Sequence, residues 1–230
     1  MIEAPDMPVL NAAEGYALWA PTYDRETAVS LLEDGLVARL TPPLARCRLL
    51  DVGCGTGRRM LVAGAAAATG VEPCREMIAA GAPGRIGRPG VCVLEGHAGA
   101  LPVPDDAFDV VWCRLVLGHA ADLARPYAEM ARAVAVGGTV IVSDFHPRAS
   151  AAGHRRTFRN AAGLHEIENH PHSLADHVAV AEAAGLVLRS QGDASIGVEV
   201  KDLFAAAGLL DVYREQLGLP LVFAMRFERC

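Results

Sequence analysis

A strand that ends in alternating glycines is the feature of this 230-residue chain that most limits how it can fold. The apolar run at residues 49–52 predicts a buried strand, which Gly53, Gly55 and Gly57 then end. The alanine-rich segment at residues 60–68 predicts a helix, because alanine has the best intrinsic helix propensity. A strand, a glycine turn and a helix N-terminus together bring backbone N–H groups up to the polar end of a ligand. The stretch therefore predicts a site for a nucleotide-like cofactor.

Short apolar runs alternate with segments of helical pattern along the rest of the chain. Strands are expected at residues 49–52, 69–73, 91–94, 108–112 and 139–142. Helices are expected at residues 25–40, 60–68, 74–80, 122–136 and 174–184. This alternation predicts a parallel sheet covered by helices on both faces. A last pair of strands, at residues 186–188 and 221–226, is expected to close its edge, and residues 1–15 are expected to form a loose arm.

The composition limits the class of protein. With 52% apolar and 21% charged residues, the chain can bury a sizeable core and suits a single domain over residues 1–230. The formal net charge of −6 argues against general affinity for nucleic acids or anionic membranes, which need a basic surface. The six cysteines form no C-x-x-C pair, which favours free thiols in a reducing cytoplasm. We expect neither a signal peptide nor a membrane-spanning segment.

The spacing of the glycines and one downstream acid narrow the choice of cofactor. A dinucleotide site needs G-x-G-x-x-G, whereas the pattern here is G-x-G-x-G and Arg58 follows the third glycine. This disfavours an NAD-type oxidoreductase, and the lack of G-K-[ST] excludes a P-loop. Glu72 ends the next expected strand, about twenty residues beyond the turn, where an acid can accept hydrogen bonds from both hydroxyls of a ribose. Without Glu72 and the βαβ context, the glycines could be a plain structural turn.

The chain resembles the class I S-adenosylmethionine-dependent methyltransferases, particularly the ubiquinone/menaquinone C-methyltransferase-like group. The resemblance covers roughly residues 16–190, and its most specific parts are LLDVGCGTG and GVEP. Supporting parts are EGHAGALPVPDDAFDVVWCRLVLGHAADL and EMARAVAVGGTVIVSDFHP. It implies an α/β, Rossmann-like fold with a mostly parallel seven-stranded sheet, helices on both faces and an antiparallel edge. It also implies S-adenosylmethionine as cofactor and a small-molecule methyl acceptor, in a monomer or homodimer without nucleic-acid partners or membrane insertion.

The resemblance further implies which residues hold the cofactor. Asp51 and the glycine turn would line its methionine end, and Glu72 would take the 2′- and 3′-hydroxyls of the ribose. The family usually has Asp-Ala after the third strand, where the Asp accepts a hydrogen bond from the adenine amino group. His97 and Ala98 stand there in this chain, and a neutral imidazole can accept one hydrogen bond. The expected cofactor-binding residues are Asp51, Gly53, Gly55, Glu72, Pro73, Met77, His97, Ala98 and Arg114.

Methyl transfer from a sulfonium depends mainly on alignment, and it needs a general base only where the acceptor must lose a proton. His119 and His146 follow the fourth and fifth strands, so they should face the crevice at the carboxyl ends; each could instead be a solvated or helix-capping histidine. Tyr16 and Tyr23 belong to an N-terminal arm and lid helix, residues 1–40, which would fold over the site. They could also merely pack the first helix onto the domain. The expected catalytic residues are His119, His146 and Tyr23.

Residues 143–172 are polar and rich in arginine and histidine, and they predict an excursion from the sheet that caps the acceptor pocket. Within it, a hairpin is expected around residues 160–163. Arg155, Arg156 and Arg159 could bind a carboxylate or phosphate of the acceptor, or could form a solvated basic face. The histidines of this segment show no zinc spacing such as H-E-x-x-H, so no metal is expected.

The sequence leaves one alternative to an active enzyme. The chain could be a catalytically silent relative that binds S-adenosylmethionine as a sensor or scaffold, and the departure at His97 is its only support. Tight cofactor binding without methyl transfer to any acceptor would favour this alternative.

Overall fold

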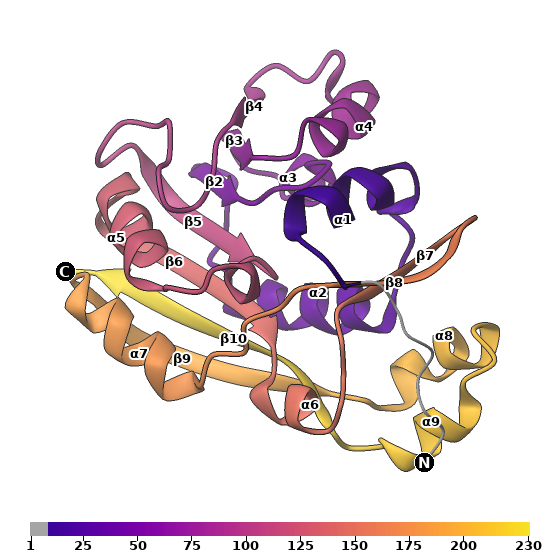
Figure 1. Cartoon of the computed structure of the whole chain (residues 1–230). Helices are drawn as coiled ribbons and strands as arrows, with labels where there is room; N and C mark the ends of the chain where they lie inside the picture. Colours follow the sequence, from indigo (N-terminus) through magenta and orange to yellow (C-terminus); the bar gives the residue numbers. More distant parts are fainter. Residues whose placement is uncertain (1–8) are drawn as a thin grey trace.

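A seven-stranded sheet forms the centre of the molecule (Figure 1). The computed structural model describes residues 9–230. The strands lie in the order β4-β3-β2-β5-β6-β10-β9. They are β2 (Arg48–Val52), β3 (Ala67–Glu72), β4 (Val91–Glu95), β5 (Phe108–Arg114), β6 (Val134–Phe145), β9 (Leu186–Ser195) and β10 (Pro220–Arg229). The first five pair in parallel and β10 is antiparallel to both neighbours, which confirms the expected mostly parallel sheet with an antiparallel edge.

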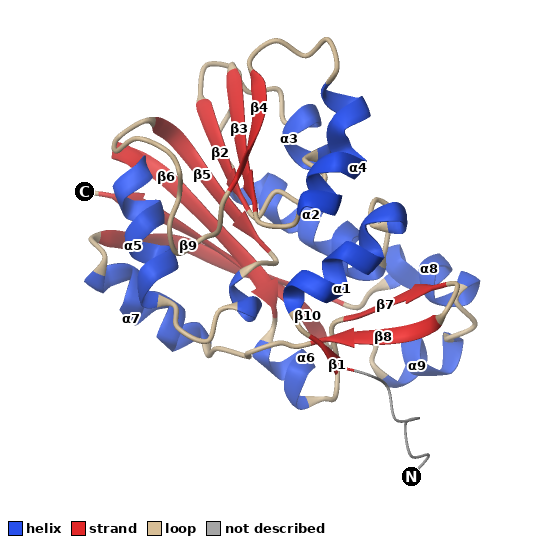
Figure 2. Ribbon diagram, turned by 45° about the horizontal axis from the view of Figure 1, so that its top comes forward, coloured by secondary structure: helices blue, strands red, loops and turns tan. Residues whose placement is uncertain are grey.

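Alternating side chains give this sheet two apolar faces, each covered by helices (Figure 2). Leu49 and Leu50 are adjacent in β2, so their side chains point to opposite faces, and both are fully buried. The Leu50 face is covered by α5 (Ala124–Ala133) and α7 (Leu174–Ala183). The Leu49 face is covered by α2 (Ala28–Leu40), α3 (Arg58–Val62), α6 (Pro147–Ala151), α8 (Lys201–Ala206) and α9 (Leu210–Glu215). In residues 9–230, no helix is both long and apolar enough to cross a bilayer.

A second, three-stranded sheet joins the N-terminal arm to the polar excursion (Figure 2). It consists of β1 (Val9–Leu10), β8 (Gly163–Ile167) and β7 (Thr157–Asn160), in that order. The expected hairpin around residues 160–163 is confirmed, since Asn160 pairs with Gly163 and Arg159 pairs with Leu164. Gly163 has a φ of 132°, a backbone conformation that side chains rarely allow, which suits glycine at this turn.

The helix α1 (Ala12–Trp19) packs on this small sheet. Gly15 lies so close to the sheet that a Cβ atom on it would be 2.7 Å from Cγ1 of Ile167. Trp19 stacks on Phe158 of β7 with ring centroids 5.3 Å apart. Together β1, α1, β7 and β8 form what we call the arm–hairpin layer. The expected loose arm is therefore wrong for residues 9–15, and residues 1–8 lie outside the described part of the chain.

The helix after the glycine turn is shorter than expected. It was expected over residues 60–68, but α3 ends at Val62 and β3 begins at Ala67. Gly64 adopts a left-handed φ of 70°, which ends the helical path. The alanines that follow pair with β2 in the sheet, so tertiary pairing overrides their helix propensity.

Two other helices also differ in their bounds. The helix expected at residues 74–80 continues as α4 (Arg75–Arg85), which contains Pro83 in its last turn. The helix expected at residues 122–136 ends at Ala133, because the residues after it already belong to β6. In both cases the expected end of the helix was set by a proline or glycine in the sequence, whereas the tertiary structure ends the helix at another residue.

A buried cluster of charges joins α2 to the ends of the central strands. Glu33 of α2 is fully buried, and its carboxylate accepts hydrogen bonds from Nε and Nη2 of Arg114 at 2.9 and 2.6 Å. Nη2 of Arg59 lies 3.3 Å from the same carboxylate, and Ser143 Oγ also donates to it. Asp34 forms ion pairs with both arginines. Every charge of the cluster thus has an opposite partner, as burial requires.

We expect Glu33→Gln to lower the free energy of unfolding by about 3 kcal/mol, because it leaves two buried guanidinium groups to share the single carboxylate of Asp34. Urea denaturation followed by circular dichroism measures the loss. Arg214→Gln is the control, since its ion pair with Asp211 is exposed and should contribute less than about 1 kcal/mol. Equal losses in the two variants would contradict a stabilising role for the buried cluster.

His177 attaches α7 to the core beneath it. Its Nδ1 is 2.9 Å from Oη of Tyr127 in α5, and its ring centroid lies 5.0 Å from that of Phe223 in β10. Burial lowers the pKa of His177 to about 4. The folded protein therefore keeps this ring neutral at a pH where the unfolded chain already binds a proton.

Stability should fall as the pH falls from about 6.5 to about 4.5, because the unfolded state binds more protons than the folded state across this window. We expect His177 to account for about 2 kcal/mol of that loss. Urea denaturation at a series of pH values measures the free energy of unfolding. Between pH 6.5 and 4.5, His177→Gln should lose about 2 kcal/mol less of it than the wild type, whereas above pH 7.5 the two proteins should show the same pH dependence. A variant that keeps the full wild-type slope would show that the ring is protonated in the folded state.

Candidate active site

Two adjoining cavities open at the carboxyl ends of the central strands. The first cavity has a volume of about 280 Å³ and is lined by the ends of β2, β3 and β5 together with α1. The second cavity has a volume of about 400 Å³ and lies between the arm–hairpin layer, α2 and α8. Tyr16, Tyr23 and Leu115 line both cavities, so they form a shared wall. Ligands in the two cavities would meet at these three residues.

The glycine turn after β2 brings the backbone to the edge of the first cavity. Gly53 and Gly55 have φ values of 69° and 58°, in the left-handed region. A Cβ atom on Gly53 would lie 2.3 Å from Val116, and one on Gly55 would lie 3.1 Å from both Met77 and Tyr23. A larger residue at either position would strain the backbone and collide with these neighbouring side chains.

Glu72 ends β3 with its carboxylate anchored to this turn. Its Oε2 accepts a hydrogen bond from the Gly55 N–H at 2.9 Å, and Oε1 accepts one from the Cys74 N–H at 3.0 Å. Burial raises the pKa of the Glu72 carboxyl, although the two N–H groups lower it. Each carboxylate oxygen can accept more than one hydrogen bond, so the group can still bind hydroxyls of a ligand. Pro73 and Met77, two further expected cofactor-binding residues, line the same cavity.

Asp51 and Arg114 are both buried near the turn, but Asp51, which was expected to line the methionine end of the cofactor, is not in the lining of the first cavity. Burial raises the pKa of Asp51 to about 6, although Arg114 and Arg59 lower it. Arg114 lines the first cavity, but its guanidinium is held by Glu33 and Asp34 of α2. Arg114 therefore shapes the cavity wall rather than offering an unpaired cation to a ligand.

The expected adenine end is not fully assembled around the first cavity. The expected cofactor-binding residues that line it are Gly53, Gly55, Glu72, Pro73, Met77 and Arg114. His97 and Ala98 lie outside this lining. His97 is exposed, and its backbone forms an isolated bridge with Ala100, whereas Ala98 packs against the apolar core.

A tyrosine–histidine pair stands at the wall between the cavities. Oη of Tyr16 is 2.9 Å from Nε2 of His119, and Nδ1 of His119 is 3.2 Å from the Glu168 carbonyl. Because a carbonyl only accepts, Nδ1 carries the proton and Nε2 accepts from the Tyr16 hydroxyl. Burial, helped by the nearby Arg156, lowers the pKa of His119 to about 4, so the ring is neutral at pH 7. Tyr16 was expected only as part of the aromatic arm, and no local pattern links it to His119.

Tyr23 is fixed at the same wall by its neighbour in the chain. The Thr56 hydroxyl donates a hydrogen bond of 2.6 Å to Asp24, and Arg58 Nη1 donates one of 3.2 Å to the Asp24 carbonyl. These contacts attach Tyr23 to the glycine turn, where its ring lies against Gly55. Burial raises the pKa of the Tyr23 hydroxyl, which keeps it protonated.

His146 lies away from both cavities. Its Nδ1 accepts a hydrogen bond of 3.0 Å from the backbone N–H of Arg148 and thereby caps α6. Its Nε2 lies 3.7 Å from Asp193 of β9, and burial lowers the pKa of the ring. The structure therefore brings Tyr23 to the shared wall and His119 to the first cavity beside Tyr16, whereas His146 lines neither cavity.

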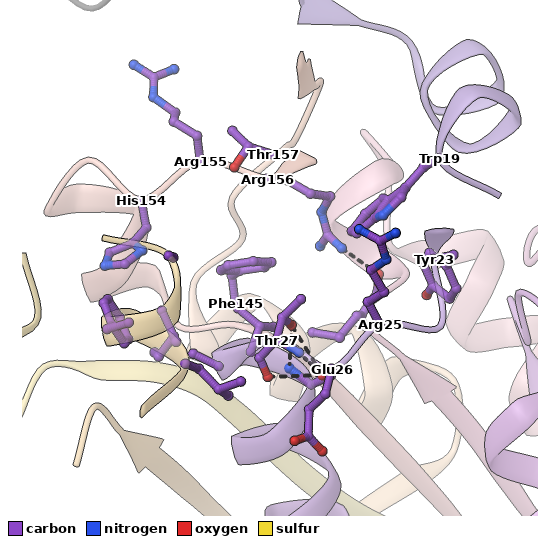
Figure 3. Close-up of a pocket in the computed structure, with 18 of the residues that line it drawn as sticks. Trp19, Tyr23, Arg25, Glu26, Thr27, Phe145, His154, Arg155, Arg156 and Thr157 are labelled. Atoms are coloured by element: carbon purple, nitrogen blue, oxygen red, sulfur yellow. Dashed lines mark hydrogen bonds between the residues drawn. The ribbon is translucent and has the colours of Figure 1, made fainter. Parts of the chain in front are cut away.

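The second cavity has an apolar floor and a rim of arginines (Figure 3). The floor includes Phe145 at the end of β6, Leu203 and Phe204 of α8, and Leu221 of β10. The rim arginines are Arg25, Arg58, Arg59, Arg155 and Arg156. Residues 198–215, which contribute α8 and α9, carried no expected element, because their apolar residues follow no clear helical period.

The histidines of the polar excursion are held by separate partners. His172 Nε2 donates a 2.7 Å hydrogen bond to the Ala120 carbonyl, and His165 stacks on Phe158 with centroids 5.0 Å apart. Within residues 9–230, no three His, Cys, Asp or Glu side chains come together in a way that could hold a metal ion. These rings therefore contribute packing and hydrogen bonds.

Known proteins share the sequence that builds the first cavity. Residues 50–142 match the family model described as "Methyltransferase domain". The chain is 37% identical over 108 residues to the demethylmenaquinone methyltransferase of Roseiflexus castenholzii, covering 45% of this chain and 44% of that protein. It is 30% identical over 196 residues to the malonyl-[acyl-carrier protein] O-methyltransferase of Methylococcus capsulatus, covering 84% and 66%. The chain spans about half to two thirds of the length of the curated relatives it matches.

The fold agrees with these matches. An S-adenosylmethionine-dependent methyltransferase from Mesorhizobium loti superposes with a TM-score of 0.63 at 19% identity, covering 84% of this chain and 95% of that one. At this identity the likeness concerns the fold alone, with its sheet and flanking helices. Because the family match runs through the glycine turn and Glu72, the two features that anchor the first cavity, residues 50–142 of this chain form a methyltransferase domain, and its fold is that of the class I S-adenosylmethionine-dependent methyltransferases.

Proposed function

We propose that this protein transfers a methyl group from S-adenosylmethionine to a small-molecule acceptor. The observation that carries the proposal is the wall of Tyr16, Tyr23 and Leu115 at which the two cavities meet. The first cavity fits the cofactor, because the glycine turn brings the backbone to its edge and the anchored Glu72 can accept the ribose hydroxyls. The second cavity would then hold the acceptor beside the methyl group.

The chain's own residues would mainly hold and align the reactants. The bound cofactor supplies an activated methyl group on a sulfonium. The rings of Tyr16 and Tyr23 at the shared wall would stabilise this cation by about 0.5–2 kcal/mol and limit the access of water. Holding the acceptor about 3–3.5 Å from the methyl carbon is the remaining task, which the second cavity would perform.

Where the acceptor must lose a proton, we assign the Tyr16–His119 pair as the group that takes this proton. Nε2 of neutral His119 accepts from the Tyr16 hydroxyl, so Tyr16 can take a proton from the acceptor as it gives its own to His119. Tyr23 would align the reactants from the other side of the wall. His146, which caps α6, takes no part in this proposal.

The proposal extends to the surroundings of the site. The arm–hairpin layer, within residues 1–40 and 143–172, would cover the acceptor in a single domain over residues 1–230. The six cysteines are free thiols, which suits a reducing cytoplasm. The net charge of −6 favours a small-molecule acceptor over nucleic acid, and the protein would act as a monomer or homodimer.

The activity test uses S-adenosylmethionine with a labelled methyl group and a broad panel of small acceptors. We expect label in at least one acceptor and a matching release of S-adenosylhomocysteine. Tight cofactor binding without label in any acceptor would support the catalytically silent alternative instead.

Glu72→Ala should weaken S-adenosylhomocysteine binding about 10- to 100-fold, because two hydrogen bonds to a charged group are lost. Isothermal titration calorimetry measures the affinity, and Glu72→Gln should give a smaller loss because it keeps one acceptor oxygen. Glu95→Ala is the matched control, since Glu95 pairs in register with Glu72 on β4 but is exposed and lies outside both cavities. Unchanged affinity in Glu72→Ala would overturn the placement of the cofactor.

A further inference from the structure

We propose that the methyl acceptor is an anion with an apolar body, whose acidic group binds Arg25 and Arg58 at the rim of the second cavity. The inference rests on the proposed function and specifies the chemistry of its acceptor. The acidic group is a carboxylate, a phosphate or a similar oxyanion, because a guanidinium presents a planar fork of donors that fits such groups.

The floor of the second cavity fits the apolar body. Phe145, Leu203, Phe204 and Leu221 come from three different elements and line one continuous surface. Phe204 and Leu221 are held in the core beneath the cavity, so the floor has a fixed shape. An apolar or aromatic ligand would be removed from water there, which favours its binding.

Three of the five rim arginines are already occupied by carboxylates. Arg59 pairs with Glu33 and Asp34 of the buried cluster. Arg156 donates a hydrogen bond of 2.7 Å to Asp144. Arg155 lies 3.1 Å from Glu166 and extends away from the cavity, as Figure 3 shows.

Arg25 and Arg58 retain donors for a ligand. Within the described residues, the Arg25 guanidinium has no ion-pair or hydrogen-bond partner, and Figure 3 shows it beside Trp19 at the rim. Nε of Arg58 is buried without an acceptor in residues 9–230, and it lies 3.7 Å from the half-exposed carboxylate of Asp24, beyond hydrogen-bond distance. Among the described residues, Arg58 donates a hydrogen bond only through Nη1, to the Asp24 carbonyl, so its Nη2 keeps donors for an oxyanion in the cavity.

The remaining charges around the cavity also favour an anion. Glu26 is the one carboxylate in the lining of the described cavity, and it is exposed and points away from Arg156 in Figure 3. A cationic acceptor would meet Arg25 and Arg58 at the rim, and a neutral acceptor would leave their charged donors without an anion. An anionic acceptor would pair with both guanidinium groups.

Two fluorescent probes with one aromatic body test the inference. They are 1-anilinonaphthalene-8-sulfonate, which is anionic, and N-phenyl-1-naphthylamine, which lacks the sulfonate. We expect the anionic probe to bind the S-adenosylhomocysteine-saturated protein at least about 10-fold more tightly than the neutral probe. The difference should shrink as salt is added, because the rim is partly exposed. Equal affinities for the two probes would overturn the inference.

Variants test where the acidic group and the aromatic body of the anionic probe bind. Arg25→Met should weaken binding of the anionic probe roughly 5- to 20-fold and leave the neutral probe unchanged. Arg155→Met is the matched control on the same rim and should change neither affinity. Leu203→Asn should weaken both probes, because it makes the floor polar. Unchanged affinity of the anionic probe in both Arg25→Met and Leu203→Asn would place the probe elsewhere and overturn the assignment.

Natural acid groups are then compared by displacement. Octanoate and octyl phosphate should displace the bound anionic probe, and the more effective of the two identifies the preferred acid, while octanol should not displace it. Failure of both acids would overturn the inference. If the wild-type protein does not bind S-adenosylhomocysteine, the proposed function itself is contradicted, so the two failures are distinguishable.

Discussion

The buried carboxylate of Glu33 is the interaction on which both cavities depend. It holds Arg114, which lines the first cavity, and Arg59, which lines the second. Arg59 belongs to α3, directly after the glycine turn, so the same carboxylate of α2 also fixes where that turn lies against the sheet. Burying these charges is costly, and only their mutual pairing makes it tolerable. A change in α2 would therefore reach the cofactor and the acceptor together, although α2 itself lies outside the lining of the first cavity.

The order of strands and helices could be predicted from the sequence because it is encoded locally. A strand covered on both faces is apolar throughout, and the predicted strands at residues 49–52 and 108–112 lie within β2 and β5. Helix ends were predicted less well, since they depend on contacts that no window of sequence contains. The alanines before Thr69 favour a helix, but the backbone hydrogen bonds offered by β2 place them in β3. For the same reason α8 and α9 were not predicted: their apolar residues are explained only by the face of the sheet on which they pack.

The residues of the candidate site also differ in whether they could be predicted from the sequence. Gly53, Gly55 and Glu72 could be predicted because a turn and the acid after the next strand lie at a fixed spacing, and the βαβ unit brings them together. The Tyr16–His119 pair could not, because the two residues are 103 positions apart and meet only after the arm folds over the sheet. Histidines near strand ends also look alike in sequence: the structure places His119 in the lining of the first cavity, whereas His146 caps α6. Distinguishing them requires the packing of α1 and α6.

The two cavities differ in how much of their lining the family model matches. Ten of the fourteen residues that line the first cavity fall within residues 50–142, whereas only Arg58, Arg59 and Leu115 of the described lining of the second cavity do so. The second cavity, the proposed acceptor site, is built from α1, α2, α8 and the polar excursion, which the family model does not match. Similarity to other methyltransferases therefore supports the cofactor, but it carries little information about the acceptor. Because Arg25 and the apolar residues of α8 belong to these unmatched segments, the acceptor must be inferred from the shape and charge of this cavity rather than from the substrates of relatives.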